Sequence, residues 1–174
     1  MRRVMMVALL LVGLQSMGAQ EKAAPALPTA EMQRLAKLFD GTWDYTETYT
    51  KGGQGSGVYT SEMGPGGNSL VHRFHSRGEM GDFEGLIVMT WDPAEKAYKS
   101  YGFGNDYSGV ILQTGQWEDD VLVYRGEFTM GKSRIAFRLT TKLVAPGKMV
   151  REQYTAVNGG AEKLFLRVEA TKRP

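Results

Sequence analysis

The sequence contains no cysteine, and only two of its 174 residues are histidine. The absence of cysteine excludes disulfide bonds, thiol catalysis, Cys-ligated zinc and iron–sulfur clusters. No G-x-S-x-G or other nucleophile motif is present. The glycine-rich run at residues 64–67 precedes an alternating stretch and not a helix, so it predicts a turn instead of a phosphate-binding loop. The fold must therefore be stabilised by its apolar core alone.

The N-terminus has the three parts of a secretory signal peptide. Arg2 and Arg3 precede an apolar run of eleven residues, and the small residues Gly18 and Ala19 follow. The run is too short to span a bilayer, so we expect no stable membrane insertion after cleavage. Residues 1–19 are predicted to be a signal peptide and the mature protein to be exported, either periplasmic or extracellular. The alternative is an uncleaved N-terminal anchor.

Removing residues 1–19 also removes the excess of positive charge. Lys+Arg falls from 21 to 19, which equals the 19 Asp+Glu. A protein that binds nucleic acid normally carries a basic stripe. The mature chain is formally neutral and has no such stripe, so we expect no nucleic-acid partner.

Residues 20–28 are rich in Ala and Pro and predict a flexible linker. Thr29 then fits the N-cap of a helix. Met32, Leu35 and Phe39 follow at helical spacing, which is typical of an amphipathic helix. Gly41 can end that helix. We expect its apolar face to cap one mouth of the structure that follows.

From about residue 41 onward, short stretches of alternating apolar and polar residues are separated by turns of Gly, Pro, Asn or Asp. The expected strands are residues 43–49, 58–63, 68–77, 83–91, 96–103, 110–117, 121–130, 134–144, 149–157 and 164–168. The connections are too short for parallel crossovers, so neighbouring strands should pair antiparallel. The sequence predicts an all-β domain over residues 29–174, an antiparallel up-and-down barrel of about eight to ten strands with one short N-terminal capping helix.

A Gly-x-Trp motif, Gly41-Thr42-Trp43, opens the first expected strand directly after the helix. It resembles the opening signature of lipocalin and calycin barrels, in which the Trp plugs the closed end. Further segments resemble the bacterial family known as domain of unknown function 1579: residues 78–85, 91–92, 96–98, 115–117 and 131–132. This resemblance covers nearly the whole mature chain. It implies a lipocalin-like barrel, and it brings no activity with it.

Several polar residues are expected on apolar faces. Strand alternation places Glu47 and Tyr49 on the face of Trp43, and Arg151 and Gln153 on that of Met149. Lone polar groups on apolar walls orient ligands in binding pockets. The sequence therefore predicts a barrel that binds a small, partly apolar molecule in its interior, without catalysis. The expected ligand-binding residues are Trp43, Tyr45, Glu47, Tyr49, His72, Phe74, Arg151 and Gln153.

His72 and His75 stand three residues apart on one expected strand, so they point to opposite faces and cannot share a metal ion. No metal and no cofactor are expected, with haem bound through His72 as an alternative. Glu79 and Asp82 lie beside glycines, which favours a solvated turn over a catalytic carboxylate pair.

Two other functions remain open. One is an enzyme, a hydrolase or isomerase, that uses the same cavity. The other is a structural or interaction module whose interior is filled. A catalytic site would need two titratable groups within hydrogen-bond reach of each other in the cavity. A filled barrel would have neither a cavity nor such a pair of titratable groups.

The signal-peptide prediction is tested by N-terminal sequencing of the exported protein. We expect a mature N-terminus at Ala19 or Gln20, because cleavage follows small residues. Recovery of an intact Met1 in the soluble exported fraction would contradict it.

Overall fold

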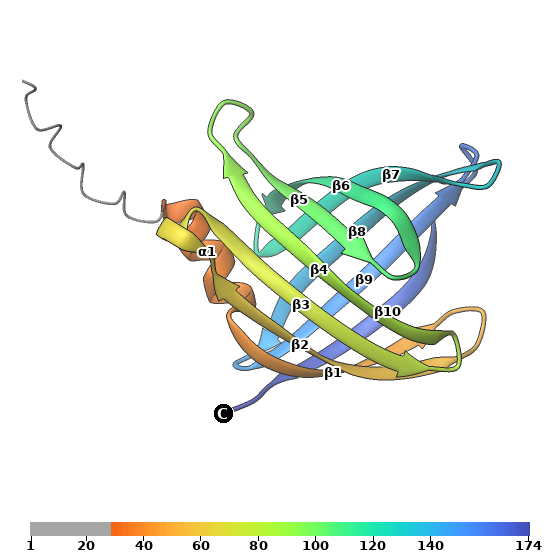
Figure 1. The fold of residues 1–174 in the computed structure, drawn as a ribbon, viewed down its shortest axis with the longest axis horizontal. Helices are drawn as coiled ribbons and strands as arrows, with labels where there is room; N and C mark the ends of the chain where they lie inside the picture. Colours follow the sequence, from red (N-terminus) through yellow and green to blue (C-terminus); the bar gives the residue numbers. More distant parts are fainter. Residues whose placement is uncertain (1–28) are drawn as a thin grey trace, which may run out of the picture.

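The computed structural model describes residues 29–174, so the predicted signal peptide and linker lie outside it. Ten antiparallel strands follow one helix and close into a barrel in which each strand pairs with its neighbours in sequence. The barrel closes where β1 (Gly41–Tyr49) pairs with β10 (Lys163–Lys172), from Trp43 opposite Lys172 to Tyr49 opposite Leu166. Figure 1 shows the tilted strands and α1 (Ala30–Phe39) across one end. The predicted fold class is confirmed.

The other eight strands and one 3-10 turn fill the chain between β1 and β10. They are β2 (Gln54–Met63), η1 (Pro65–Gly67), β3 (Ser69–Gly78), β4 (Gly81–Asp92), β5 (Ala97–Gly104), β6 (Tyr107–Glu118), β7 (Val121–Met130), β8 (Ser133–Ala145) and β9 (Lys148–Val157).

The second strand starts earlier than its sequence predicts. We expected it from residue 58, because glycines are usually turn residues, but β2 begins at Gln54. Gly55 and Gly57 pair with Glu47 and Tyr45 on β1. A Cβ at Gly57 would lie 2.6 Å from the ring of Tyr45, so the glycine makes room for a neighbouring side chain inside the barrel.

The helix forms as the sequence predicts. The Thr29 hydroxyl accepts a hydrogen bond from the Met32 N–H (3.2 Å) and caps the first turn. Met32, Leu35 and Phe39 are buried against the barrel. The Trp43 indole N–H donates to the Phe39 carbonyl (2.9 Å), which fixes the end of the helix over the barrel wall.

The apolar core is densest at the helix end. Trp43 stacks on Tyr59 with ring centroids 5.9 Å apart, and both side chains are buried. Among the residues on the apolar side of their strands, Trp43 and Phe137 are buried. Ile87, Leu139 and Leu166 are partly buried and pack against the core, and Phe83 and Phe128 are partly buried.

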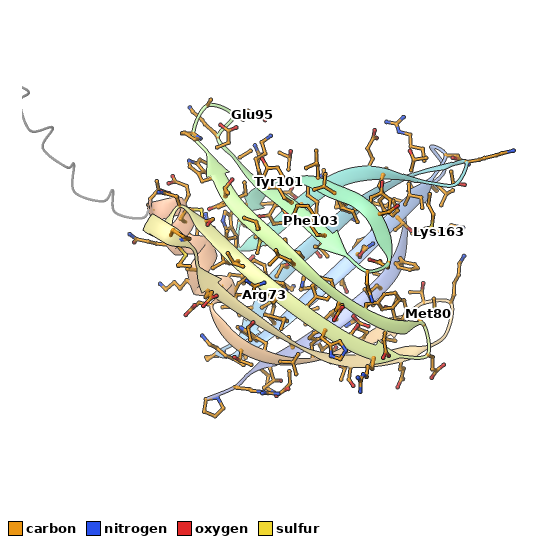
Figure 2. All side chains as sticks on the ribbon, viewed as in Figure 1. Arg73, Met80, Glu95, Tyr101, Phe103 and Lys163 are labelled. Carbon is orange, nitrogen blue, oxygen red and sulfur yellow. The ribbon has the colours of Figure 1, made fainter. Side chains whose placement is uncertain are left out.

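The outer face carries the charged residues, together with an exposed apolar strip. Arg73 lies outside, as predicted for the neighbour of an inward-facing residue. Tyr101 and Phe103 on β5 also project outward, and they are 39% and 47% exposed (Figure 2). Within residues 29–174, no helix is long and apolar enough to cross a bilayer.

Two strand glycines make a matched test of packing inside the barrel. A Cβ at Gly126 would lie 2.5 Å from the Leu112 carbonyl oxygen and 2.7 Å from the Phe137 ring. Gly126→Ala should therefore lower the free energy of unfolding by about 1–3 kcal/mol in urea titration. At Gly102 the atom nearest to an added Cβ would be 3.7 Å away. Gly102→Ala should therefore change the free energy of unfolding by less than about 1 kcal/mol. Equal effects of the two substitutions would refute this account of the glycines.

Candidate functional site

A small cavity lies in the middle of the barrel, under the end of the helix. About 20 Å³ of it can be reached by the centre of a water molecule. The residues that line it are Phe39, His72, Ile87, Met89, Ser100, Gln113, Tyr124, Leu139, Thr141 and Arg151. The helix and seven strands, β3 to β9, therefore meet around one partly polar, partly apolar space.

Three polar side-chain atoms at this cavity are buried without a hydrogen-bond partner in residues 29–174. They are the Tyr124 hydroxyl, the Thr141 Oγ1 and the Arg151 Nε. A buried polar atom without a partner costs about 1–3 kcal/mol. All three belong to residues that line the same space. Because the three unpaired atoms face one space, a single polar group placed there could form hydrogen bonds with all of them.

Arg151 supplies the positive charge of the interior. It stands on β9 between the inward positions of Met149 and Gln153 and lines the cavity. Its guanidinium carbon lies 6.0 Å from the centre of the Phe39 ring. Among the described residues, no carboxylate comes within 4.0 Å of it.

Glu47 is an inward carboxylate, and it lies more than 4.0 Å from the guanidinium of Arg151. The Glu47 carboxylate leans over Gly55 on β2, where a Cβ would lie 2.9 Å from its Oε2. Arg151 stands on β9, beyond β10 on the other side of β1. The Tyr49 hydroxyl donates to Glu47 Oε2 (3.2 Å). Burial raises the pKa of Glu47, and the hydrogen bond from Tyr49 and the positive charge of Arg151 partly offset this.

His72 is fully buried and uncharged. Its Nδ1 lies 2.8 Å from the Ser61 hydroxyl, and its ring packs against Tyr59 at 4.4 Å. Burial lowers the pKa of His72 well below the usual value, and the positive charge of Arg151 adds to the effect. Haem ligation by His72 stays a prediction, and it would require the side chains around this water-sized space to move.

The tyrosines of the interior keep their protons. Burial raises the pKa of Tyr45 to about 12 and raises the pKa of Tyr124 further. Both phenols therefore act as hydrogen-bond donors at any physiological pH. The cavity offers a cation and hydroxyl donors toward a ligand, and no ionised acid.

Of the eight predicted site residues, His72 and Arg151 line the cavity. Trp43 belongs to the plug at the helix end, and Tyr45 is buried beneath Gly57. The other four are partly buried: Glu47, Tyr49, Phe74 and Gln153. Whether any of the eight binds a ligand stays a prediction.

Sequence reasoning missed Tyr124 and Thr141 as site residues. Alternation did place Tyr124 on the apolar face of β7, but it could not show that its hydroxyl lacks a partner. Thr141 shares a face with Phe137 and Leu139, and that alternation was the available signal. Within the described part of the chain, no three His, Cys, Asp or Glu side chains gather as a metal site would need.

The fold and the cavity together define a closed, ten-stranded antiparallel barrel with a capped end and a polar cavity inside. A family model described as "Protein of unknown function (DUF1579)" matches residues 27–172. The chain belongs to this family, as the sequence motifs predicted. No curated protein matches the chain.

Three solved structures with a similar fold are each distant in sequence from this chain. Rv2717c from M. tuberculosis is 10% identical with a TM-score of 0.56, over 84% of this chain and 99% of that one. The S-type phycobiliprotein lyase CPES from Guillardia theta is 10% identical with a TM-score of 0.50, over 82% and 92%. A de novo designed fluorescence-activating β-barrel is 14% identical with a TM-score of 0.45, over 80% and 98%. At these identities the similarity shows the fold alone.

The lowered pKa of His72 predicts a loss of stability in mild acid. Below the usual histidine value of 6.5, the unfolded chain binds a proton that the folded protein does not. Stability should therefore fall as the pH drops from about 6.5 toward the folded pKa, by up to about 1.4 kcal/mol per pH unit.

Urea titrations between pH 7 and pH 5 measure this slope, and His72→Gln should reduce it. His75→Gln, on the exposed face of the same strand, should retain it. Glu47, whose raised pKa acts with the opposite sign, is present in all three proteins, so the difference isolates His72. An unchanged slope in His72→Gln would show that another group causes any loss.

Proposed function

We propose that this protein is an exported barrel that binds a small, partly apolar molecule in its interior. The observation that carries the proposal is the set of three unpaired polar atoms around one cavity in the core. Binding pockets combine apolar walls with a few convergent polar groups. Export rests on the N-terminal sequence pattern alone.

A buried water molecule can occupy this cavity in the unliganded protein. A water needs roughly 10–15 Å³ for its centre and two to four polar partners, and the cavity supplies both. A ligand that places a polar group there would displace the water and take over its hydrogen bonds. The water-sized space is then the inner end of the site, and side chains of the interior would have to move to admit the rest of the ligand.

The interior becomes more accessible away from the helix. Along β1, the inward residues Trp43 and Tyr45 are buried, whereas Glu47 and Tyr49 are partly exposed. Along β3, His72 is buried and Phe74 is partly exposed. Ser76, the next inward residue of β3, is buried, so the support for entry from the end opposite the helix comes from the partly exposed Glu47, Tyr49 and Phe74.

Binding fits this arrangement better than catalysis. Glu47 and Tyr49 lie within hydrogen-bond reach of each other, but neither lines the cavity. The phycobiliprotein lyase shares the architecture, so one barrel of this shape does belong to a protein named as a lyase. At 10% identity, that likeness carries neither its activity nor its ligand to this chain.

The proposal is tested by native mass spectrometry of the purified protein. We expect a small molecule to remain bound. Gentle unfolding should release it, so that the measured mass falls to that of the polypeptide. A protein purified from its natural host without any bound small molecule, and with no binding to a panel of apolar compounds, would favour a filled structural barrel.

Shape-conserving substitutions separate binding from folding. Tyr124→Phe combined with Thr141→Val removes two unpaired hydroxyls, so the free energy of unfolding should stay the same or rise. The same double variant should lose most of the bound molecule in native mass spectra, with roughly tenfold lower affinity or more.

The matched control is Thr140→Val combined with Tyr154→Phe, since these hydroxyls have partners at Glu152 instead of the cavity. It should keep the bound molecule. Equal retention by both double variants would show that the cavity hydroxyls do not contact a ligand.

A further inference from the structure

We propose that the cavity receives a carboxylate, and that the ligand is a monocarboxylic acid with an apolar tail bound head-inward. This inference rests on the proposed function and adds the chemical class of the ligand. It is argued from the partners that the cavity lacks, from the charges that surround it and from the shape of the interior.

The missing group is a hydrogen-bond acceptor. The Arg151 Nε can only donate, and the Tyr124 hydroxyl keeps its proton and is able to donate as well. The Thr141 hydroxyl donates or accepts as needed. A carboxylate carries two oxygens with about four lone pairs, so it can accept from all three. Arginine also matches a planar carboxylate through its planar fork of N–H groups.

Within residues 29–174 no carboxylate forms an ion pair with Arg151, although its positive charge acts on Glu47 from a greater distance. Gly55 gives the Glu47 carboxylate room to lie over β2, away from β9. Arg151 is partly buried, and its buried Nε has no hydrogen-bond partner in residues 29–174, which is unfavourable. A bound monoanion would supply the missing charge without displacing Glu47 from Tyr49.

The remaining polar groups at the cavity do not compete for this role. His72 is uncharged and hydrogen-bonded to Ser61, so it adds neither a second cation nor an anion. Ser100 and Gln113 are neutral. One positive charge therefore faces the space, which fits one negative charge better than two.

The tail would lie against the apolar part of the same wall. Ile87, Met89 and Leu139 line the cavity beside the polar atoms. Beyond them, Phe74 and Phe137 follow on inward positions of β3 and β8, toward the end opposite the helix. The head group lies innermost because Phe39 and the helix close the other side.

Three probes of equal chain length test the charge of the head group. Isothermal titration calorimetry would compare octanoate, octanol and octylamine binding to the purified protein in a carboxylate-free buffer. Octanoate should bind roughly 10- to 100-fold more tightly than the other two, because charge-assisted hydrogen bonds exceed neutral ones and Arg151 repels an ammonium. Equal binding of octanol would overturn the carboxylate assignment and leave interior binding intact.

Arginine variants locate the effect. Arg151→Met keeps the length of the side chain and should reduce octanoate affinity to that of octanol. Arg138→Met removes a cation that pairs with Glu162 on the outer face, and should leave octanoate binding unchanged. An equal loss of octanoate affinity in both variants would show that octanoate does not bind at Arg151 inside the barrel, and it would overturn the proposal. If Arg151→Met fails to fold, the ranking of the three probes on the unmodified protein decides alone.

Absence of binding by all three probes would also overturn the carboxylate assignment. The proposed function is judged separately, by the native mass spectra of the protein as purified. A bound neutral molecule in those spectra would keep the proposed function and reject the further inference.

Discussion

The arrangement of the interior depends on the plug that α1 forms at one end of the barrel. The Trp43 indole donates to the Phe39 carbonyl, and the Tyr98 hydroxyl donates to the Glu31 carbonyl (3.0 Å). These bonds hold Phe39 over the barrel, where its ring lines the cavity beside Arg151 and His72. Because that end is closed, the Tyr124 hydroxyl, the Thr141 Oγ1 and the Arg151 Nε are shielded from bulk water. Their unpaired state is a consequence of the plug.

Glycines then decide where the charges of the interior lie. At Gly55 the missing side chain leaves space for the Glu47 carboxylate, and at Gly57 it leaves space for the Tyr45 ring. The carboxylate rests on β2 while the guanidinium stands on β9, so two opposite charges share one interior without forming an ion pair. Packing between neighbouring strands thereby controls the electrostatics of the site.

Alternation and turn chemistry were enough to predict the barrel, its ten strands and its capping helix, because each depends on local residue order. The same alternation placed Arg151 and His72 inside. It could not show that the Glu47 carboxylate lies over Gly55 and forms no ion pair with Arg151, since that depends on a glycine in the next strand. Nor could it single out Thr141, whose missing partner is a property of the assembled core. The start of β2 was misjudged for the same reason, because its glycines serve packing instead of turning.

The pairing of β1 with β10 joins the first and last strands of the chain. During synthesis, β1 emerges from the ribosome before the other strands, and its partner β10 emerges after them. Until β10 is complete, one edge of β1 and one edge of β9 have no strand to bind. The nascent chain therefore cannot close, and a truncation that removes the last strand would leave two open edges prone to association with other chains.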